Sequence, residues 1–335
     1  MKAKIAIDAM GGDFAPAACV QGAQLALEET PNIEIYLVGR SSEISSLIKG
    51  RGDGIYIVDA KEVITMDEAP ALSVRRKKDS SINRAMGMLK NREADVFIGA
   101  GNTGAVVCAA TMILRTLPGV ERPGIAIIFP TVKGFSLMID VGANIDPKPL
   151  HLFQYGLMGA AYAELILDKK NPSLGLLNIG EEESKGTEFM KIVNTLLKEG
   201  AANYIGNIEG RDIFFGKCDV VVADGFVGNV ALKVSESVAM ATAALLKKHI
   251  KQSILSRLGA LLMLPALKKM KRDMDYTEYG GAPLLGVDGN VIICHGSSSS
   301  KAIKNSIKVA KEMVDIDLRE KIRDRIASVQ IGEIR

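Results

Sequence analysis

Short apolar runs that end in polar, glycine-containing turns recur along the chain of 335 residues, and longer amphipathic stretches separate them. This alternation is typical of parallel β-strands joined by α-helices. Strands are expected at residues 4–8, 34–38, 55–58, 96–98, 124–129, 136–140, 174–178, 203–208, 220–223 and 291–294. Helices are expected at residues 15–29, 42–49, 80–91, 105–115, 148–167, 184–199, 228–251 and 299–314. No internal repeat or long linker interrupts the pattern, which predicts a single α/β domain over residues 1–335.

The composition favours a globular protein, with 47% hydrophobic and 24% charged residues. No run approaches the ~18 consecutive apolar residues that span a bilayer, and residues 1–8 resemble a strand rather than a signal peptide. A cytoplasmic protein is therefore expected. The four cysteines lack CxxC spacing and the three histidines are scattered, so reduced thiols and no metal site are predicted. Neither a cofactor nor a nucleic-acid partner is expected.

The turn at residues 99–104 contains three glycines in six residues and precedes an expected helix. Bare backbone N–H groups at the positive end of a helix bind anions such as phosphate. We therefore predict a phosphate-binding loop, in which the Asn102 amide and the Thr103 hydroxyl lie beside the backbone N–H groups. Its residues are Gly101, Asn102, Thr103 and Gly104. Alternatively, Asn102 only stabilises the turn.

Four further turns carry polar residues after apolar runs, at residues 8–13, 178–186, 224–229 and 294–298. Open α/β sheets place their binding sites at the carboxyl ends of the strands. If all the strands are parallel, these turns and the 99–104 loop lie together at one edge of the sheet. The sequence therefore predicts one shared site built from five turns.

Residues 244–275 depart from the α/β pattern. Residues 247–272 contain eight basic residues and no acidic one, whereas the formal charge of the chain is only +3, so the remainder sums to −5. Within them, positions 254, 255, 258, 261 and 262 share one helical face before Pro265. The pattern predicts a projecting amphipathic helical segment that contacts an anionic membrane, an acidic partner or a second subunit. The expected contact residues are Leu258, Leu261, Leu262, Lys268, Lys269, Lys271 and Arg272.

Several motifs occur in an order that resembles the phosphate acyltransferase family, the acyl-carrier-protein:phosphate transacylases of bacterial phospholipid synthesis. They lie at residues 7–13, 101–105, 140–144, 178–183, 207–212, 224–230 and 280–286, and the resemblance spans residues 4 to about 314. Two positions depart from the family pattern, with Phe14 in place of a histidine and Val227 in place of a threonine. The resemblance implies a three-layer α/β/α fold of the isocitrate dehydrogenase type, with a mostly parallel sheet, and a homodimer.

The resemblance also implies the reaction. Inorganic phosphate attacks the thioester of a long-chain acyl group on acyl carrier protein, and acyl-phosphate and a free thiol are formed. Phosphate is itself the nucleophile, so no Ser-His-Asp or Cys-His arrangement is needed. The enzyme must instead bind phosphate, stabilise the oxyanion and assist the leaving thiolate. Acyl-phosphate then passes to a downstream acyltransferase, which is a possible direct partner.

The polar residues of the turns are candidates for these tasks. Lys185 is the candidate cation for phosphate, Asn229 the donor to the thioester oxygen, and His295 the acid for the leaving sulfur. Each also has a structural interpretation: a solvated lysine, a helix cap and a hydrogen-bonded histidine. Carboxylates repel phosphate, so the remaining candidates are expected to orient an amide or a lysine, or to take a proton. These are Asp224, Asp8 and Asp13.

Acyl carrier proteins are acidic, and a basic docking surface is therefore expected. Residues 247–272 are the first candidate and residues 75–78 the second, and peripheral attachment to the membrane is expected through 247–272. Two other functions remain open. A nucleotide-linked dehydrogenase also uses glycine loops, although the 99–104 loop is not a GxGxxG motif. The protein is alternatively a non-catalytic scaffold on the membrane surface, an interpretation that depends on residues 247–272 alone.

Overall fold

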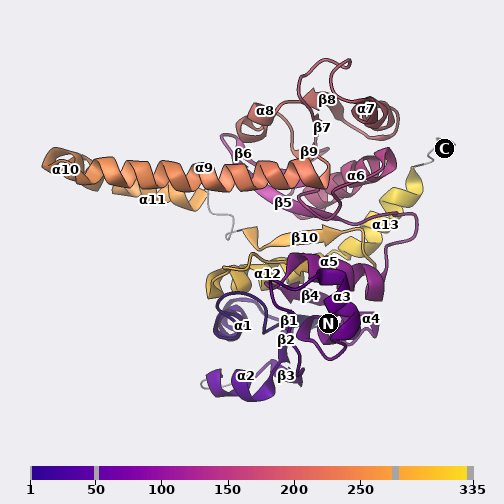
Figure 1. Ribbon diagram of the computed structural model, residues 1–335, viewed down its shortest axis with the longest axis vertical. Coiled ribbons are helices and arrows are strands. Elements are labelled where there is room, and N and C mark those ends of the chain that lie inside the picture. Colours follow the sequence, from indigo (N-terminus) through magenta and orange to yellow (C-terminus); the bar gives the residue numbers. More distant parts are fainter. Residues whose placement is uncertain (1, 49–52, 274–278, 330–335) are drawn as a thin grey trace.

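The computed structural model describes residues 2–48, 53–273 and 279–329 of the chain. These residues form one sheet of eleven strands in the order β3-β2-β1-β4-β11-β10-β5-β6-β9-β7-β8, with helices on both faces (Figure 1). The strands are β1 (Ala3–Asp8), β2 (Ile33–Gly39), β3 (Ile55–Asp59), β4 (Val96–Gly99), β5 (Gly124–Thr131), β6 (Gly134–Ile139), β7 (Leu174–Leu177), β8 (Tyr204–Ile208), β9 (Val220–Val222), β10 (Ala282–Leu285) and β11 (Asn290–Ile293).

The helices lie on both faces of the sheet, apart from three that project from it. They are α1 (Ala17–Glu29), α2 (Ser41–Leu47), α3 (Pro70–Arg76), α4 (Ser81–Lys90), α5 (Thr103–Ala109), the π-helical turn η1 (Ala110–Leu114), α6 (Pro149–Leu165), α7 (Glu188–Gly200), α8 (Gly210–Phe215), α9 (Gly225–Lys251), α10 (Ile254–Leu262), α11 (Leu264–Asp273), α12 (Ser300–Asp315) and α13 (Leu318–Ser328). Successive residues of β1 alternate between two cores: Ile5 and Ile7 pack with α1, α6 and α12, whereas Ala6 packs with α4 and α5. The predicted three-layer α/β/α fold with a mostly parallel sheet is therefore confirmed.

The sheet consists of two halves that run in opposite directions. Among the described strands, β10 pairs antiparallel with β11 and with β5, and β5 pairs antiparallel with β6. All the other pairs are parallel, so β6, β9, β7 and β8 run against β1, β2, β3, β4 and β11. The prediction that five turns share one edge is therefore wrong. The turns after β7 and β9 leave the sheet in the direction opposite to those after β1, β4 and β11.

The carboxyl ends of the two halves nevertheless reach the same level of the sheet. Ile292, near the end of β11, pairs with Pro283 of β10. Ile139, the last residue of β6, pairs with Ala126 of β5. The neighbouring residue of β5, Ile125, pairs with Leu284 of β10. Turns from both halves therefore lie on either side of the central strands β10 and β5.

The helices α9, α10 and α11 form an arm that projects from the sheet (Figure 1). Helix α9 has 27 residues, which corresponds to about 40 Å, and of these only Gly225 and Gly228 are buried. Helix α10 contains no buried residue. The predicted projecting segment is confirmed, although the arm already begins at Gly225. The side chains of Lys271 and Arg272, and residues 274–275, lie outside the described part of the chain.

Candidate active site

A cavity of about 360 Å³ lies between the two halves of the sheet. Its polar lining comes mainly from the start of α5, the turn after β11 and the N-terminal part of α9, with Thr103, Gly104, His295, Ser298, Asn229, Lys233 and Glu236. Its apolar lining comes mainly from β5, β11 and α9, with Ile125, Ile127, Ile128, Val141, Leu232 and Ile293. Such a cavity can hold an apolar chain beside a polar reacting group.

The start of α5 contributes backbone N–H groups to the cavity. Helix α5 continues through η1, so the helical segment Thr103–Leu114 is twelve residues long. The Asn102 side chain is its N-cap and accepts a hydrogen bond from the N–H of Ala105 at 3.0 Å. Thr103 and Gly104 line the cavity directly after this cap. Among the described residues, the N–H groups of Thr103 and Gly104 have no acceptor, so the helix start supplies two donors at a positive helix end.

The Asn102 amide group is occupied within the protein. Its Nδ2 donates to the carbonyl oxygens of Thr65, Met66 and Glu68 at 3.1, 3.3 and 3.2 Å, and the residue is buried. The side chain thus fastens the 65–68 loop to the start of α5. This arrangement favours the structural interpretation of Asn102 over a direct contact of its amide with phosphate.

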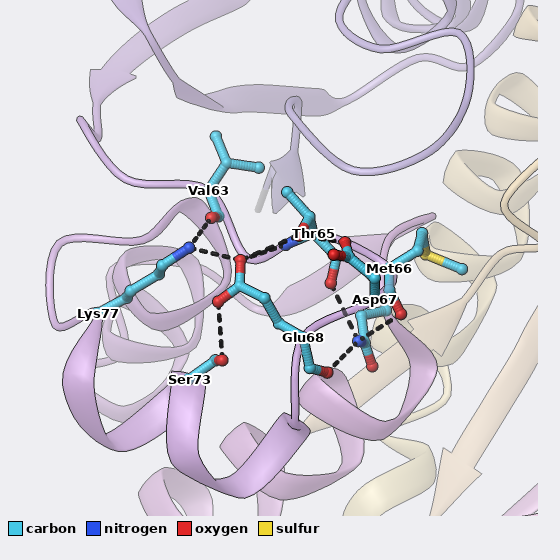
Figure 2. Close-up of polar contacts among 8 residues, drawn as sticks. Val63, Thr65, Met66, Asp67, Glu68, Ser73 and Lys77 are labelled. Carbon is cyan, nitrogen blue, oxygen red and sulfur yellow. Dashed lines mark hydrogen bonds and ion pairs between the residues drawn. The ribbon is translucent and has the colours of Figure 1, made fainter.

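The Glu68 carboxylate organises the same loop (Figure 2). It accepts hydrogen bonds from the N–H and the hydroxyl of Thr65, both at 3.0 Å, and from the Ser73 hydroxyl at 2.8 Å. It also pairs with the Lys77 ammonium group, which donates to the Val63 carbonyl as well. The Lys77 contact and these hydrogen bonds lower the pKa of Glu68 to about 2. Sequence reasoning did not find this cluster, because its members belong to an exposed loop and the short helix α3.

Asp8 supports the turns on the β1 and β4 side of the cavity. Its buried carboxylate accepts a hydrogen bond from the N–H of Met10 at 3.1 Å. A Cβ atom at Gly11 would lie 2.5 Å from Asp8 Oδ2, and one at Gly101 would lie 3.4 Å from it. Burial raises the pKa of Asp8. The carboxylate therefore lies behind both glycine turns rather than in the cavity.

Asp13 lies next to the turn after β11. Its side chain is exposed, and its N–H donates to the carbonyl oxygen of Gly296 at 2.8 Å. A Cβ atom at Gly296 would lie 3.9 Å from Asp13 Oδ1. Asp13 therefore joins the turns after β1 and β11 without lining the cavity.

The first turn of α9 packs directly on the 140–144 loop. The Asp224 carboxylate caps the helix, since Oδ1 accepts from the N–H groups of Phe226 and Val227 at 3.0 and 2.9 Å. A Cβ atom at Gly228 would lie only 1.9 Å from the Asp140 carbonyl oxygen. Asn229 follows and lines the cavity. Among the described residues, its amide has no hydrogen-bond partner, so it can bind a ligand.

The 140–144 loop is held by a buried carboxylate. Asp140 accepts hydrogen bonds from the N–H groups of Ile125, Gly142, Ala143 and Asn144 at 2.8–3.1 Å. Burial raises the pKa of Asp140, whereas the four N–H donors favour its ionised form. The loop is therefore a rigid support for α9. The motif at residues 140–144 is visible in the sequence, but its role as a support is not.

His295 lines the cavity at the end of β11. Its Nδ1 lies 3.2 Å from the N–H of Ser297 and 2.8 Å from the Ser297 hydroxyl. A backbone N–H can only donate, so Nδ1 is the acceptor and the proton of the neutral imidazole is on Nε2. In this tautomer the donor of the ring is Nε2–H, and His295 also makes a further interaction within the protein.

Lys185 lies outside the cavity. It is exposed in the loop after β7, where its N–H donates to the Glu182 carbonyl oxygen at 3.0 Å. A different cation, Lys233, lines the cavity and pairs with Glu236 at 3.0 Å. Sequence reasoning missed Lys233, although it is four residues after Asn229 and therefore on the same face of α9. No three His, Cys, Asp or Glu side chains gather as metal ligands in the part of the chain that the structure describes.

The fold is that of a class of α/β enzymes that includes phosphotransacetylases. A phosphotransacetylase from Streptococcus pyogenes superposes with a TM-score of 0.61, and the match covers 94% of each chain at 18% sequence identity. At this identity the similarity shows the fold alone. It supports the three-layer architecture.

Sequence comparison identifies the family. A family model described as "Fatty acid synthesis protein" matches residues 3–321. The phosphate acyltransferase of Heliobacterium modesticaldum is 48% identical over 327 residues, which cover 96% of this chain and 97% of the relative. The phosphate acyltransferase of Pelotomaculum thermopropionicum is 48% identical over 330 residues, which cover 98% of this chain and 96% of the relative. The chain belongs to the phosphate acyltransferase family, and it is a transferase enzyme. Neither the dehydrogenase nor the scaffold interpretation is supported.

Proposed function

We propose that this enzyme transfers a long-chain acyl group from acyl carrier protein to inorganic phosphate, and so supplies acyl-phosphate for phospholipid synthesis. Family membership supports acyl transfer to phosphate. The observation that carries the proposal is the cavity, which joins a helix start, the Asn229 amide and the His295 imidazole to an apolar interior. This combination suits a reaction between a small dianion and the thioester of an apolar chain.

Phosphate binds at the start of α5 in this proposal. The N–H groups of Thr103 and Gly104 and the Thr103 hydroxyl are the donors, and the positive helix end favours the dianion. Gly101 shapes the turn, because a Cβ atom there would lie 3.2 Å from the Gly11 Cα atom. Lys233 on α9 is a further donor to the phosphate, although its charge is shared with Glu236, which also lines the cavity. Lys185, predicted from the sequence, stays a second candidate cation.

The proposed chemistry needs no covalent enzyme intermediate. A phosphate oxygen attacks the thioester carbonyl carbon, the new C–O bond forms, and the C–S bond breaks. Asn229 Nδ2 donates to the carbonyl oxygen as its negative charge develops. His295 Nε2–H donates to the departing sulfur. Hydrogen phosphate and thioester give acyl-phosphate and thiol, so the phosphate proton ends on the sulfur and charge is conserved.

Thiol release tests the proposal. Purified protein is given acyl carrier protein thioester and phosphate, without nicotinamide cofactor, and the free thiol is measured. Asn229→Ala is expected to lower turnover about 10²-fold, which is the usual effect of losing one oxyanion donor. Asn91→Ala, at the exposed end of α4, is the control and is expected to keep normal turnover. Absence of phosphate-dependent thiol release from the wild-type protein would refute the function.

We also propose a homodimer formed through α9. Valines at positions 230, 234 and 238 and Leu245 lie on one face of the helix, and all four are exposed in the single chain. A second copy can cover this apolar face. Replacement of Val234 and Val238 by glutamate is then expected to yield monomers in sedimentation experiments. A dimer that survives both changes would contradict this arrangement.

Peripheral attachment of the arm to an anionic membrane is the last part of the proposal. Helix α10 exposes Leu258, Leu261 and Leu262, with Lys268 and Lys269 nearby on α11. Among the described helices, α9 is long and apolar enough to cross a membrane by length and composition alone. However, α9 also carries Lys233 and Asn229 of the cavity, which favours a helix that stays with the protein. The enzyme is thus expected in the cytoplasm, attached at the membrane surface.

A further inference from the structure

A basic and apolar surface lies on α3, outside the cavity. Leu72, Arg75 and Arg76 are spaced i, i+3 and i+4, so they share one face of the helix, and all three are exposed. Leu72 is 48% exposed. Among the residues that the structure describes, neither arginine takes part in an ion pair. The positive charge of this face is therefore available to a partner.

This face adjoins the two polar ends of the cavity. A Cβ atom at Gly104 would lie 2.7 Å from Pro70 Cγ, so the start of α3 packs on the first turn of α5. Met66, which precedes α3, is 56% exposed. Its Cε atom is 3.6 Å from the position of a Cβ atom at Gly296, the residue after His295. Met66 and α3 thus border both the proposed phosphate site and the histidine.

The same face is fixed relative to the cavity. Glu68 ties the 63–68 loop to α3 through Ser73 and Lys77, and Asn102 ties that loop to α5. Figure 2 shows that the Met66 side chain points away from the Glu68 carboxylate. A surface that delivers a tethered thioester to a cavity benefits from such rigidity, since small misplacements of reacting groups are costly in rate.

We propose that the acyl carrier protein docks on this face, formed by Met66, Leu72, Arg75 and Arg76. The inference rests on the proposed function, and the charge is complementary to an acidic carrier. Within the loop, the Glu68 charge is compensated by Lys77, whereas the exposed Asp67 keeps its negative charge. The two arginines outweigh this one carboxylate, and the face carries a net positive charge.

The distance to the cavity favours α3 over the basic residues 247–272. Lys247 is 18 residues after Asn229 on the same straight helix, or about 27 Å along its axis. Figure 1 shows α10 at the far end of the arm. In contrast, α3 contacts the helix whose first turn lines the cavity. We therefore place α3 before residues 247–272 as the docking surface for the carrier.

Charge reversal separates the two surfaces. The double variant Arg75→Glu/Arg76→Glu is compared with Lys268→Glu/Lys269→Glu on α11. Each is assayed by thiol release with the acyl group on the carrier protein and with the same acyl group on pantetheine alone. The α3 variant is expected to raise KM for the carrier thioester at least tenfold, to reduce its dependence on salt, and to change kcat/KM for the pantetheine thioester less than twofold. The α11 variant is expected to leave all three quantities unchanged.

Other outcomes overturn the docking proposal. An equal loss of kcat/KM for the carrier and pantetheine thioesters would mean that the α3 substitutions damage the cavity. The milder variant Arg75→Ala/Arg76→Ala is then assayed in the same way, and an equal loss with both donors again would refute docking on α3. An unchanged KM for the α3 variant together with a raised KM for the α11 variant would assign docking to the arm. In each case, activity of the wild-type protein with carrier thioester and phosphate would still support the proposed function. A wild-type protein that is inactive with both donors refutes the function itself.

Discussion

Replacement of Gly228 by alanine places a methyl group where the backbone of Asp140 already lies. The new Cβ atom would be 1.9 Å from the Asp140 carbonyl oxygen, whereas real Cβ contacts stay above 3.0 Å. The first turn of α9 or the 140–144 loop must therefore move by at least the difference, 1.1 Å. The loop resists this movement, because the Asp140 carboxylate holds it through four N–H groups.

The expected cost follows from this displacement. Overpacking by a methyl group costs about 3 kcal/mol when neighbours cannot relax, and about 1 kcal/mol is regained because alanine is the better helix former. The net loss is thus about 2 kcal/mol. For 335 residues the unfolding entropy is about 0.7 kcal/mol/K, so Tm is expected to fall by about 3 °C. Turnover is expected to fall about 10²-fold, because Asn229 moves by about 1 Å.

Gly87→Ala is the matched control. Gly87 is also within a helix, α4, but a Cβ atom there would meet nothing within 4 Å. This change is expected to stabilise the protein by about 1 kcal/mol and leave thiol release unchanged. Both variants are compared by thermal unfolding and by thiol release at saturating phosphate. A Gly228→Ala protein that unfolds at the wild-type temperature with normal turnover would refute the reasoning, as would an equal loss of stability in Gly87→Ala.

Three further outcomes are expected. Asn102→Ala removes the α5 cap and the donor to three carbonyl groups, so it should cost about 2 kcal/mol of stability and raise KM for phosphate; a variant with normal thermal unfolding and phosphate dependence would contradict this. The Glu68 pKa is lowered from 4.5 to about 2 in the folded protein, so its contribution to stability is complete above about pH 4.5 and is lost as the pH falls toward 2. Glu68→Gln should therefore show a shallower decrease of Tm over that range, and identical pH profiles would exclude the role. Leu258→Glu or Leu261→Glu should weaken binding to anionic vesicles about 10- to 100-fold while soluble thiol release stays normal, and vesicle binding retained by both would argue against the membrane contact.

The succession of strands and helices could be predicted from the sequence, because burial leaves a clear apolar period in each element. Strand β10 was not predicted. It has four residues, of which one is Pro283, and its pairing depends on β11 and on the distant strand β5. Helices α3, α8 and α13 were also not predicted. Their short or highly charged sequences carry little periodicity, and packing on neighbours stabilises them.

The sequence does contain an indication that half of the sheet runs in the opposite direction. Strands β5 and β6 are joined by only two residues, Val132 and Lys133. Parallel neighbours need a crossover of a dozen or more residues, so this short connection forces an antiparallel pair. That single hairpin reverses every later strand of its half. The turns after β4, β11 and β9 therefore come together across the central strands rather than along one edge.

The sequence by itself determined which residues lie in turns and at helix starts, because glycine, asparagine and aspartate at the ends of apolar runs have strong local preferences. Only the tertiary structure decided which of these side chains face the cavity. Asn102 and Asp224 are used as helix caps, whereas Asn229, His295 and Lys233 line the cavity. The reason is that a side chain keeps hydrogen-bonding capacity for a ligand only where neighbouring groups do not use all of it. Packing between segments far apart in the chain decides which groups become neighbours, as the 65–68 loop does for Asn102.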